Sequence, residues 1–192
     1  QAKAKVEKDG FVVKFSDHIF SNTLGYSATA QERAEDLNQM FADPTIKMVW
    51  CARGGQNCNS LFDEIDFENI CQHPKIFCGY SDITSLSNAI YAKTGLVTFS
   101  GTNFKTIATD ETEYSYEEVK KRFVEGSLAL KKKKKYQVIQ EGVTEGVLVG
   151  GNLSLTRGLV DGKYALDFRD KILFLEELSL ESGPALVSNF LY

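Results

Sequence analysis

Histidine, proline and long apolar runs are scarce in this chain of 192 residues. It contains only two histidines and three prolines. No apolar run approaches the roughly 20 residues that a membrane-spanning helix needs, and no signal peptide opens the chain. Hydrophobic residues make up 43% and charged residues 25% of the chain, which is typical of a globular protein and not of a disordered one. We therefore expect a soluble, cytoplasmic protein without a membrane partner.

The charge balance excludes a nucleic-acid surface as the main function. The net charge is −4 and the isoelectric point lies near 5.3. Five consecutive lysines, Lys131 to Lys135, form a basic run, but the run lacks the interleaved aromatic residues of a nucleic-acid surface. We interpret the run as a solvated linker and expect no nucleic acid partner.

The cysteines do not have the spacing of a metal or disulfide framework. No two of them form a Cys-x-x-Cys pair, and the chain has only two histidines that could add imidazole ligands. Cys51 and Cys78 lie inside apolar runs, which suits buried thiols in a reducing compartment. We expect no metal and no other cofactor. The residues concerned are Cys51, Cys58, Cys71, Cys78, His18 and His73.

The stretch that dominates the sequence predicts a buried strand, a glycine turn and a helix start. Residues 46–52 are almost entirely apolar, as in a strand covered on both faces of a parallel sheet. Gly54 and Gly55 allow backbone angles closed to other residues and leave their amides uncovered. Cys58 would then lie near the positive end of a helix dipole, where the pKa of its thiol should fall. This is the geometry of a nucleophile elbow; the alternative is a core cysteine beside an ordinary turn.

Strands and helices alternate around this stretch. The expected elements are a helix over 30–41 capped by Thr29, a helix after the glycine turn to about Ile65, a strand at 76–79, a helix from Ser81 to Gly95 and a strand at 96–99. This alternation predicts an α/β fold with a doubly wound parallel sheet. Ligands of such sheets bind beyond the carboxyl ends of the strands, where Gly54-Gly55 and Ser81-Asp82 would lie.

The two ends of the chain have a different pattern. Further expected elements are a short strand at 11–15, a charged helix from Ser115 to about Lys131, and short β runs at 136–139, 146–149 and 171–175. We therefore expect an α/β nucleophile-bearing domain over residues 1–130, a linker at 131–136, and an incomplete β-rich domain at 137–192. The chain ends within a predicted helix and lacks an opening strand, so we expect it to be truncated.

Five ordered blocks resemble the LD-carboxypeptidase and microcin C immunity family of serine peptidases. The first contains Cys-Ala-Arg-Gly-Gly at 51–55 and Asn-Cys-Asn-Ser-Leu at 57–61, and the others lie at 74–84, 93–99, 146–153 and 171–177. The resemblance runs from about Gly25 to the last residue and leans toward the microcin-immunity branch. It implies a small peptide or peptidyl-nucleotide substrate, and a smaller swivelling β/β/α-like second domain. A homodimer is left open.

The resemblance also implies which residues carry the chemistry. The family's triad serine falls on Cys58, and its triad glutamate falls on Glu176, with Glu177 as the alternative. The amides of Gly55 and Asn59 are the expected oxyanion donors, one from the glycine turn and one after the nucleophile. The list of expected oxyanion and substrate-binding residues is Gly54, Gly55, Asn59, Ser81 and Asp82.

Two departures from the family pattern leave the function open. No histidine follows Glu176, and neither His18 nor His73 matches a family site. Ser100 stands where the family usually has histidine. Three functions are compatible with the sequence: a hydrolase of the LD-carboxypeptidase type that cleaves an amide next to a free carboxylate, an inactive relative that binds peptides, and a class I glutamine amidotransferase-like domain, whose downstream His-x-Glu is not found here.

Overall fold

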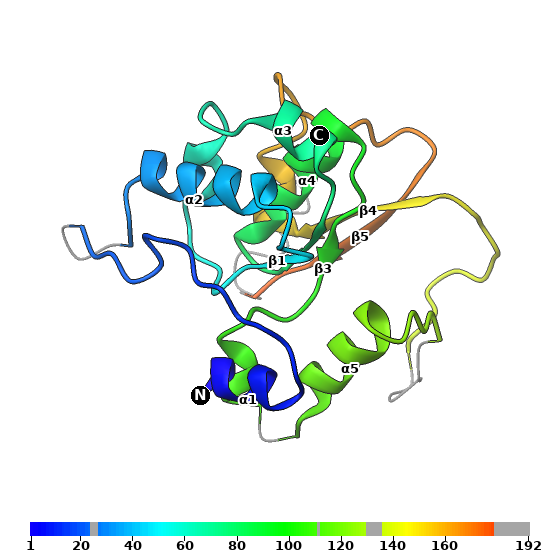
Figure 1. The fold of residues 1–192 in the computed structure, drawn as a ribbon. Coiled ribbons are helices and arrows are strands. Elements are labelled where there is room, and N and C mark those ends of the chain that lie inside the picture. Colours follow the sequence, from blue (N-terminus) through cyan, green and yellow to red (C-terminus); the bar gives the residue numbers. More distant parts are fainter. Residues whose placement is uncertain (24–26, 111, 130–135, 179–192) are drawn as a thin grey trace.

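The computed structural model describes residues 1–23, 27–110, 112–129 and 136–178 (Figure 1). The elements in chain order are α1 (Ala2–Lys8), α2 (Ala30–Ala42), β1 (Met48–Trp50), the 3₁₀ helix η1 (Cys58–Leu61), α3 (Phe67–Gln72), β2 (Ile76–Gly79), α4 (Ile83–Thr94), β3 (Phe99–Ser100), the 3₁₀ helix η2 (Thr106–Ala108), α5 (Tyr114–Phe123), β4 (Val147–Asn152), α6 (Leu153–Arg157) and β5 (Lys171–Glu176). None of the helices in these ranges has both the length and the apolar character needed to cross a membrane.

Three parallel strands form the central sheet, in the order β1-β2-β3. Trp50 of β1 pairs with Cys78 of β2, and Cys78 pairs with Phe99 of β3. Neighbouring parallel strands need a crossover connection, which α3 and α4 supply here. The predicted parallel α/β sheet is therefore confirmed, although β1 covers only three residues of the apolar run 46–52.

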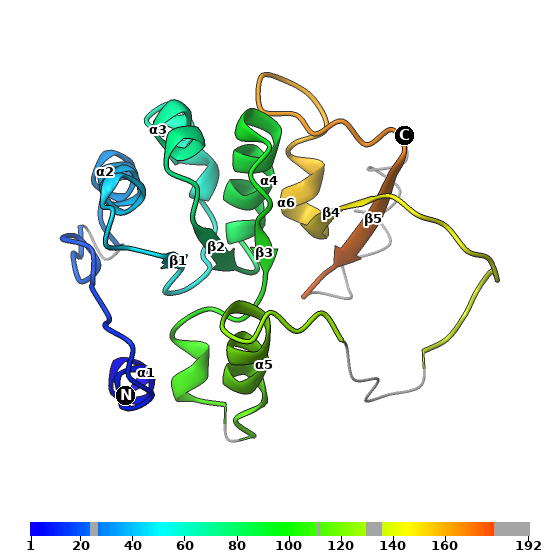
Figure 2. The ribbon, with the colours of Figure 1, turned by 45° about the vertical axis from the view of Figure 1, so that its right-hand side comes forward.

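The helices α2, α3 and α4 cover one face of the sheet (Figure 2). Phe41 of α2, Ile70 of α3, Phe77 of β2 and Ile90 of α4 are fully buried in the core between them. Burial of each such side chain stabilises the fold by about 1.5–3 kcal/mol. The predicted capping box opens α2, and the predicted left-handed Gly95, with φ 72°, ends α4.

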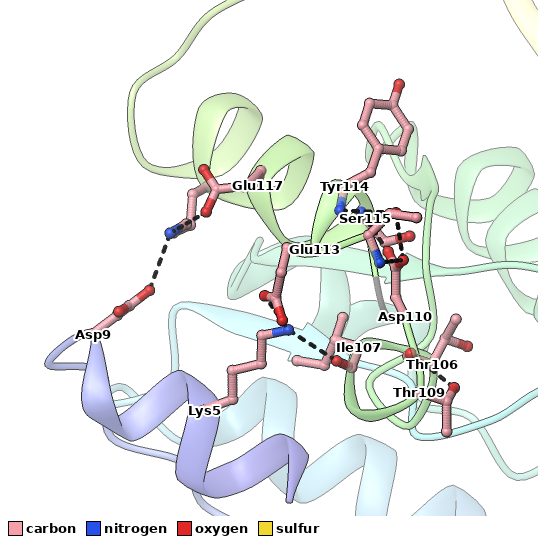
Figure 3. Close-up of polar contacts among 12 residues, drawn as sticks. Lys5, Asp9, Thr106, Ile107, Thr109, Asp110, Glu113, Tyr114, Ser115 and Glu117 are labelled. Atoms are coloured by element: carbon pink, nitrogen blue, oxygen red, sulfur yellow. Dashed lines mark hydrogen bonds and ion pairs between the residues drawn. The ribbon is translucent and has the colours of Figure 1, made fainter.

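The helices α1 and α5, with η2, cover the opposite face (Figure 2). Ile107 and Tyr116 are buried there, with Trp50 of β1 packed against their cluster. In Figure 3, Lys5 of α1 forms an ion pair with Glu113, and its Nζ donates a hydrogen bond to the carbonyl oxygen of Ile107 at 3.2 Å. Because helices cover both faces of the parallel sheet, the domain is doubly wound, as predicted.

Several predicted boundaries are wrong. No strand is assigned at 11–15 or 136–139, because a strand needs a neighbour to pair with and neither segment has one among the described residues. The charged helix ends at Phe123, well before the predicted Lys131. The helix expected after the glycine turn is replaced by the four-residue η1 and by α3, which starts at Phe67 behind the capping carboxylate of Asp66. Helix α1 was not predicted.

A second, two-stranded parallel sheet consists of β4 and β5. It docks on α4 through two hydrogen bonds: Asn88 Nδ2 donates to the carbonyl oxygen of Gly150 at 3.1 Å, and the amide of Asn152 donates to Thr84 Oγ1 at 3.0 Å. The lysine run of the predicted linker, Lys131 to Lys135, lies outside the described residues, as does the predicted helix at the chain end. The domain boundary at 131–136 stays a prediction.

Candidate active site

The glycine turn after β1 packs tightly against the segment that follows β2. A Cβ atom on Gly54 would lie 2.9 Å from Ser81 Cβ, and one on Gly55 would lie 3.3 Å from Asp82 Oδ2. Neither glycine has a positive φ angle. The turn therefore does not use the positive φ angles that glycine allows, and it requires glycine at Gly54 because of the close approach of Ser81.

The segment between β2 and α4 brings Ser81 and Asp82 to this turn. Ser81 has φ 67°, in the left-handed region that few residues other than glycine adopt. Asp82 follows as the N-cap of α4 and is only 1% exposed. Its Oδ2 accepts hydrogen bonds from the amides of Asn57, at 2.8 Å, and Cys58, at 2.9 Å. Five of the predicted site residues, which are Gly54, Gly55, Cys58, Ser81 and Asp82, thus lie together.

Cys58 is the first residue of η1 and is buried at the edge of the core formed with α2 and α4. Burial raises the pKa of its thiol, and the carboxylate of Asp82 beside it raises the pKa further. The expected low pKa is wrong. A four-residue 3₁₀ helix carries only a small dipole, and its effect does not overcome desolvation and a neighbouring negative charge.

The predicted oxyanion donors face solvent. Gly55 and Asn59 are both exposed, and the described part of the chain holds no hydrogen-bond acceptor for either amide. The amides of Asn57 and Cys58 lie between them in sequence but already donate to Asp82. The exposed amides therefore remain free to bind a ligand oxygen.

Arg33 of α2 is a site residue that the sequence did not indicate. Its guanidinium donates to Asn57 Oδ1 and to Ser60 Oγ, both at 3.2 Å, while its buried Nε has no acceptor among the described residues. The positive charge of Arg33 favours the thiolate form of Cys58 and so opposes the rise in the pKa of the thiol. The helical pattern placed Arg33 on a polar face, and only the fold brings it to the turn.

The two glutamates after β5 have different environments. Glu177 Oε2 accepts from the amide of Ser154, at 3.2 Å, and from its hydroxyl, at 2.5 Å, and Glu177 Oε1 accepts from Asn152 Nδ2 at 3.4 Å. These contacts, with the Ser154 contact first, lower the pKa of Glu177. The side chain of Glu176 makes no hydrogen bond or ion pair with the described residues. Glu177 therefore anchors α6, whereas the carboxylate of Glu176 has no such partner.

Glu176 connects to the glycine turn through intermediate residues. It pairs with Asn152 in the register of β4 and β5, and the amide of Asn152 donates to Thr84 Oγ1. Thr84 lies two residues after Asp82, so the start of α4 contacts both the glycine turn and the second sheet. No contact between Glu176 and Cys58 is present among the described residues.

The two histidines of the chain are engaged elsewhere. His18 Nδ1 lies 2.9 Å from Asp36 Oδ1, and this hydrogen bond raises the pKa of His18. His73 Nδ1 lies 2.9 Å from Asn69 Oδ1 of α3. Neither histidine contacts Cys58. Within the described ranges, no group of three His, Cys, Asp or Glu side chains is placed to hold a metal ion.

The other cysteines are separate from this turn. Cys51 follows β1, and Cys78 belongs to β2. Burial of the Cys78 thiol raises its pKa to about 12. Cys71 of α3 is the exposed thiol. All four cysteines are free.

Comparison with known proteins identifies the family of this chain. Residues 1–101 match the LD-carboxypeptidase N-terminal domain, and residues 145–191 match the LD-carboxypeptidase C-terminal domain. The probable murein peptide carboxypeptidase of Bacillus subtilis (strain 168) is 39% identical over 193 residues, which cover 92% of this chain and 56% of that protein.

Solved structures agree with this match. An MccF-like protein from Bacillus anthracis str. Ames has a TM-score of 0.87 and 34% identity, covering 99% of this chain and 65% of that one. The microcin C7 self-immunity protein MccF in complex with aspartyl sulfamoyl adenosine has a TM-score of 0.82 and 26% identity, covering 97% and 65%. This chain therefore spans between about half and two thirds of the length of these proteins. It belongs to the LD-carboxypeptidase family.

Proposed function

We propose that this chain carries the nucleophile of a carboxypeptidase that cleaves an amide bond next to a free carboxylate. The observation that carries the proposal is the turn that holds Cys58: the amides of Asn57 and Cys58 are fixed by Asp82, while the amides of the exposed residues Gly55 and Asn59 donate to no acceptor among the described residues. A fixed nucleophile flanked by free amide donors is the arrangement that acyl transfer requires.

The proposed reaction begins with attack of Cys58 Sγ on the scissile carbonyl carbon. The carbonyl oxygen takes up negative charge, which the amides of Gly55 and Asn59 stabilise. The thiol proton passes to a general base, and the C–N bond breaks as the leaving amine is protonated. Water then cleaves the thioester and regenerates the thiol. Glu176 would orient the imidazole of the base.

The proposed substrates are murein peptides or peptidyl-nucleotides, and a competition test shows whether the site recognises a free carboxylate. One relative is named a murein peptide carboxypeptidase, and MccF was solved with aspartyl sulfamoyl adenosine. Both kinds of molecule contain an aminoacyl group, that is, an amino acid attached through its carbonyl carbon. A peptide with a free terminal carboxylate should compete for the site, and the same peptide with an amidated terminus should not.

A second function, peptide binding without turnover, is favoured by the positions of the histidines. His18 and His73 are held by Asp36 and Asn69, so neither can take the proton of Cys58 in this arrangement. The raised pKa of the thiol also keeps it protonated at neutral pH. We therefore expect the 192-residue chain to acylate slowly and to release little product.

The test is acylation of the 192-residue chain by an activated ester of an N-acyl amino acid, followed by intact mass and peptide mapping. We expect a slow adduct on Cys58, absent in Cys58→Ala, with no steady hydrolysis of an LD-linked tetrapeptide. Cys71→Ala is the matched control, since Cys71 is the exposed thiol of α3 and not part of the turn. An adduct that persists in Cys58→Ala would refute Cys58 as nucleophile, and steady hydrolysis would refute the binding alternative.

A further inference from the structure

We infer that Asp82 is a positioning residue, which fixes the turn that bears Cys58, and not a residue that binds substrate. This inference rests on the proposed function, because it takes Cys58 as the nucleophile. It differs from the sequence-based expectation that Asp82 contacts the ligand. The carboxylate faces into the protein, since the residue is only 1% exposed.

The hydrogen bonds show how Asp82 acts on the turn. Oδ2 accepts from two consecutive amides, those of Asn57 and Cys58, at 2.8 and 2.9 Å. Two bonds from neighbouring peptide units to one atom fix the orientation of both units. Hydrogen bonds to a charged acceptor are shorter and roughly twice as strong as neutral ones. The backbone at the nucleophile is therefore held before any ligand arrives.

The placement of Asp82 depends on Ser81. Ser81 adopts the left-handed conformation, with φ 67°, and its side chain packs against Gly54. Such a conformation in a residue other than glycine or asparagine persists only where its surroundings determine it. Here it turns the chain from the end of β2 into α4 so that Asp82 meets the amides of the turn.

The second carboxylate oxygen of Asp82 supports the same role. Oδ1 is buried and has no hydrogen-bond partner among the described residues. The Asp82 carboxylate also acts on the thiol of Cys58. An unpaired buried carboxylate oxygen is costly, so the two amide hydrogen bonds to Oδ2 are what holds the carboxylate at the turn. Arg33 holds the opposite side of the turn through the side chains of Asn57 and Ser60.

The first test measures amide hydrogen exchange by NMR in the 192-residue chain and its Asp82 variants. In Asp82→Ala, we expect the amides of Asn57 and Cys58 to exchange at least about tenfold faster, because both lose a charged acceptor. In Asp82→Asn, the neutral side-chain carbonyl can still accept both amides but binds them more weakly than a carboxylate, so the increase should be smaller, about threefold. Amides in the middle of α4, such as Ile90, should not change.

Asp110→Ala is the matched control. The Asp110 carboxylate also accepts two backbone amides, from Thr112 at 3.0 Å and Ser115 at 2.8 Å, on the opposite side of the sheet (Figure 3). Its loss should speed exchange at Thr112 and Ser115 and leave Asn57 and Cys58 unchanged. Unchanged exchange at Asn57 and Cys58 in Asp82→Ala, or an equal increase at all amides, overturns the inference.

The second test uses the acylation of Cys58 by the activated ester. Asp82→Ala should lower the limiting acylation rate about tenfold with an unchanged half-saturating ester concentration, and Asp82→Asn should restore most of it. A purely structural defect would not be rescued in this way. If the unaltered chain is not acylated, the proposed function fails while the exchange data still decide the role of Asp82. If the alanine variant does not fold, a local increase in Asp82→Asn at Asn57 and Cys58 supports the inference, and no increase overturns it.

Discussion

Two glycine pairs lie against the start of α4, and they need glycine for different reasons. Gly54-Gly55 belongs to the turn before η1, and Gly150-Gly151 lies near the end of β4. The first pair has no positive φ angle, and added Cβ atoms would meet the side chains of Ser81 and Asp82. The second pair has φ angles of +119° and +123°.

The second pair is also more crowded by backbone atoms. A Cβ atom on Gly150 would lie 2.1 Å from the carbonyl oxygen of Phe174, and one on Gly151 would lie 2.8 Å from Thr84 Oγ1. Side chains can shift by a few tenths of an ångström, whereas the backbone of a paired strand cannot do so without loss of the pairing. Glycine is therefore required in β4 by backbone conformation and by close contact, and in the turn before η1 by close contact alone.

The largest effect should come from Gly150→Ala. The substitution adds a Cβ at a φ angle that alanine disfavours and places it against the carbonyl oxygen of Phe174. We expect a loss of more than about 3 kcal/mol in the free energy of unfolding, or failure to fold. Urea denaturation followed by circular dichroism measures it.

Gly142→Ala is the control for that substitution. Gly142 has open space within 4 Å of an added Cβ and no positive φ angle. Its free energy of unfolding should stay within about 0.5 kcal/mol of the unaltered chain. A loss below about 1 kcal/mol in Gly150→Ala would contradict the need for glycine at this position of β4.

Gly54→Ala should have the next largest effect. Its Cβ would lie 2.9 Å from Ser81 Cβ, at a residue whose left-handed backbone leaves little freedom to shift. We expect a loss of about 1–3 kcal/mol by overpacking. The double variant Gly54→Ala with Ser81→Gly removes the crowding side chain and should recover most of the loss, so an additive double variant would argue against this contact.

The elements with local signals were predictable from the sequence. The capping pair Thr29 and Glu32 predicts the start of α2, and Gly95 predicts the end of α4. The failures concern non-local pairing: residues 11–15 have the composition of a strand, but a strand forms only beside another strand. The Gln1 side chain at the start of α1 accepts no backbone amide of the helix, so the sequence carries no local capping signal for α1.

The candidate site could be predicted only in part. The motif around Gly54 and Cys58 marked the turn, because its residue types and spacing are local. The environment of the thiol depends on Asp82 and Arg33, which lie 24 and 25 positions away in the sequence and meet it only after packing. Burial and a neighbouring carboxylate raise the pKa of Cys58, and no local pattern reveals either effect.

A pH-dependent effect should distinguish the two regions. Hydrogen bonds, that from Ser154 first, lower the pKa of Glu177 beside the second glycine pair. The contribution of Glu177 is therefore present above the ordinary glutamate pKa and is lost as the pH falls through the lowered pKa. Glu177→Gln should cost about 1 kcal/mol near neutral pH and little under acid conditions.

The measurement is the free energy of unfolding by urea at several pH values. The difference between the unaltered chain and Glu177→Gln should shrink as the pH falls below about 4.5. Glu176→Gln is the matched control, since Glu176 has no polar contact among the described residues, and it should show no such trend. A pH-independent difference for Glu177→Gln would show that its carboxylate does not hold the second sheet.

The smallest effect should come from Gly55→Ala, which completes the comparison. Its Cβ would lie 3.3 Å from Asp82 Oδ2, a close but tolerable contact, while Gly55 itself has no positive φ angle. Replacing glycine by alanine at a compatible backbone angle stabilises by about 0.4–1 kcal/mol through the unfolded chain. This gain and the tight contact nearly cancel, so the free energy of unfolding should change by less than about 1 kcal/mol. The amide of Gly55 is retained, so acylation of Cys58 should persist as well; a loss as large as that of Gly54→Ala would show that both glycines of the turn are held by the same contact.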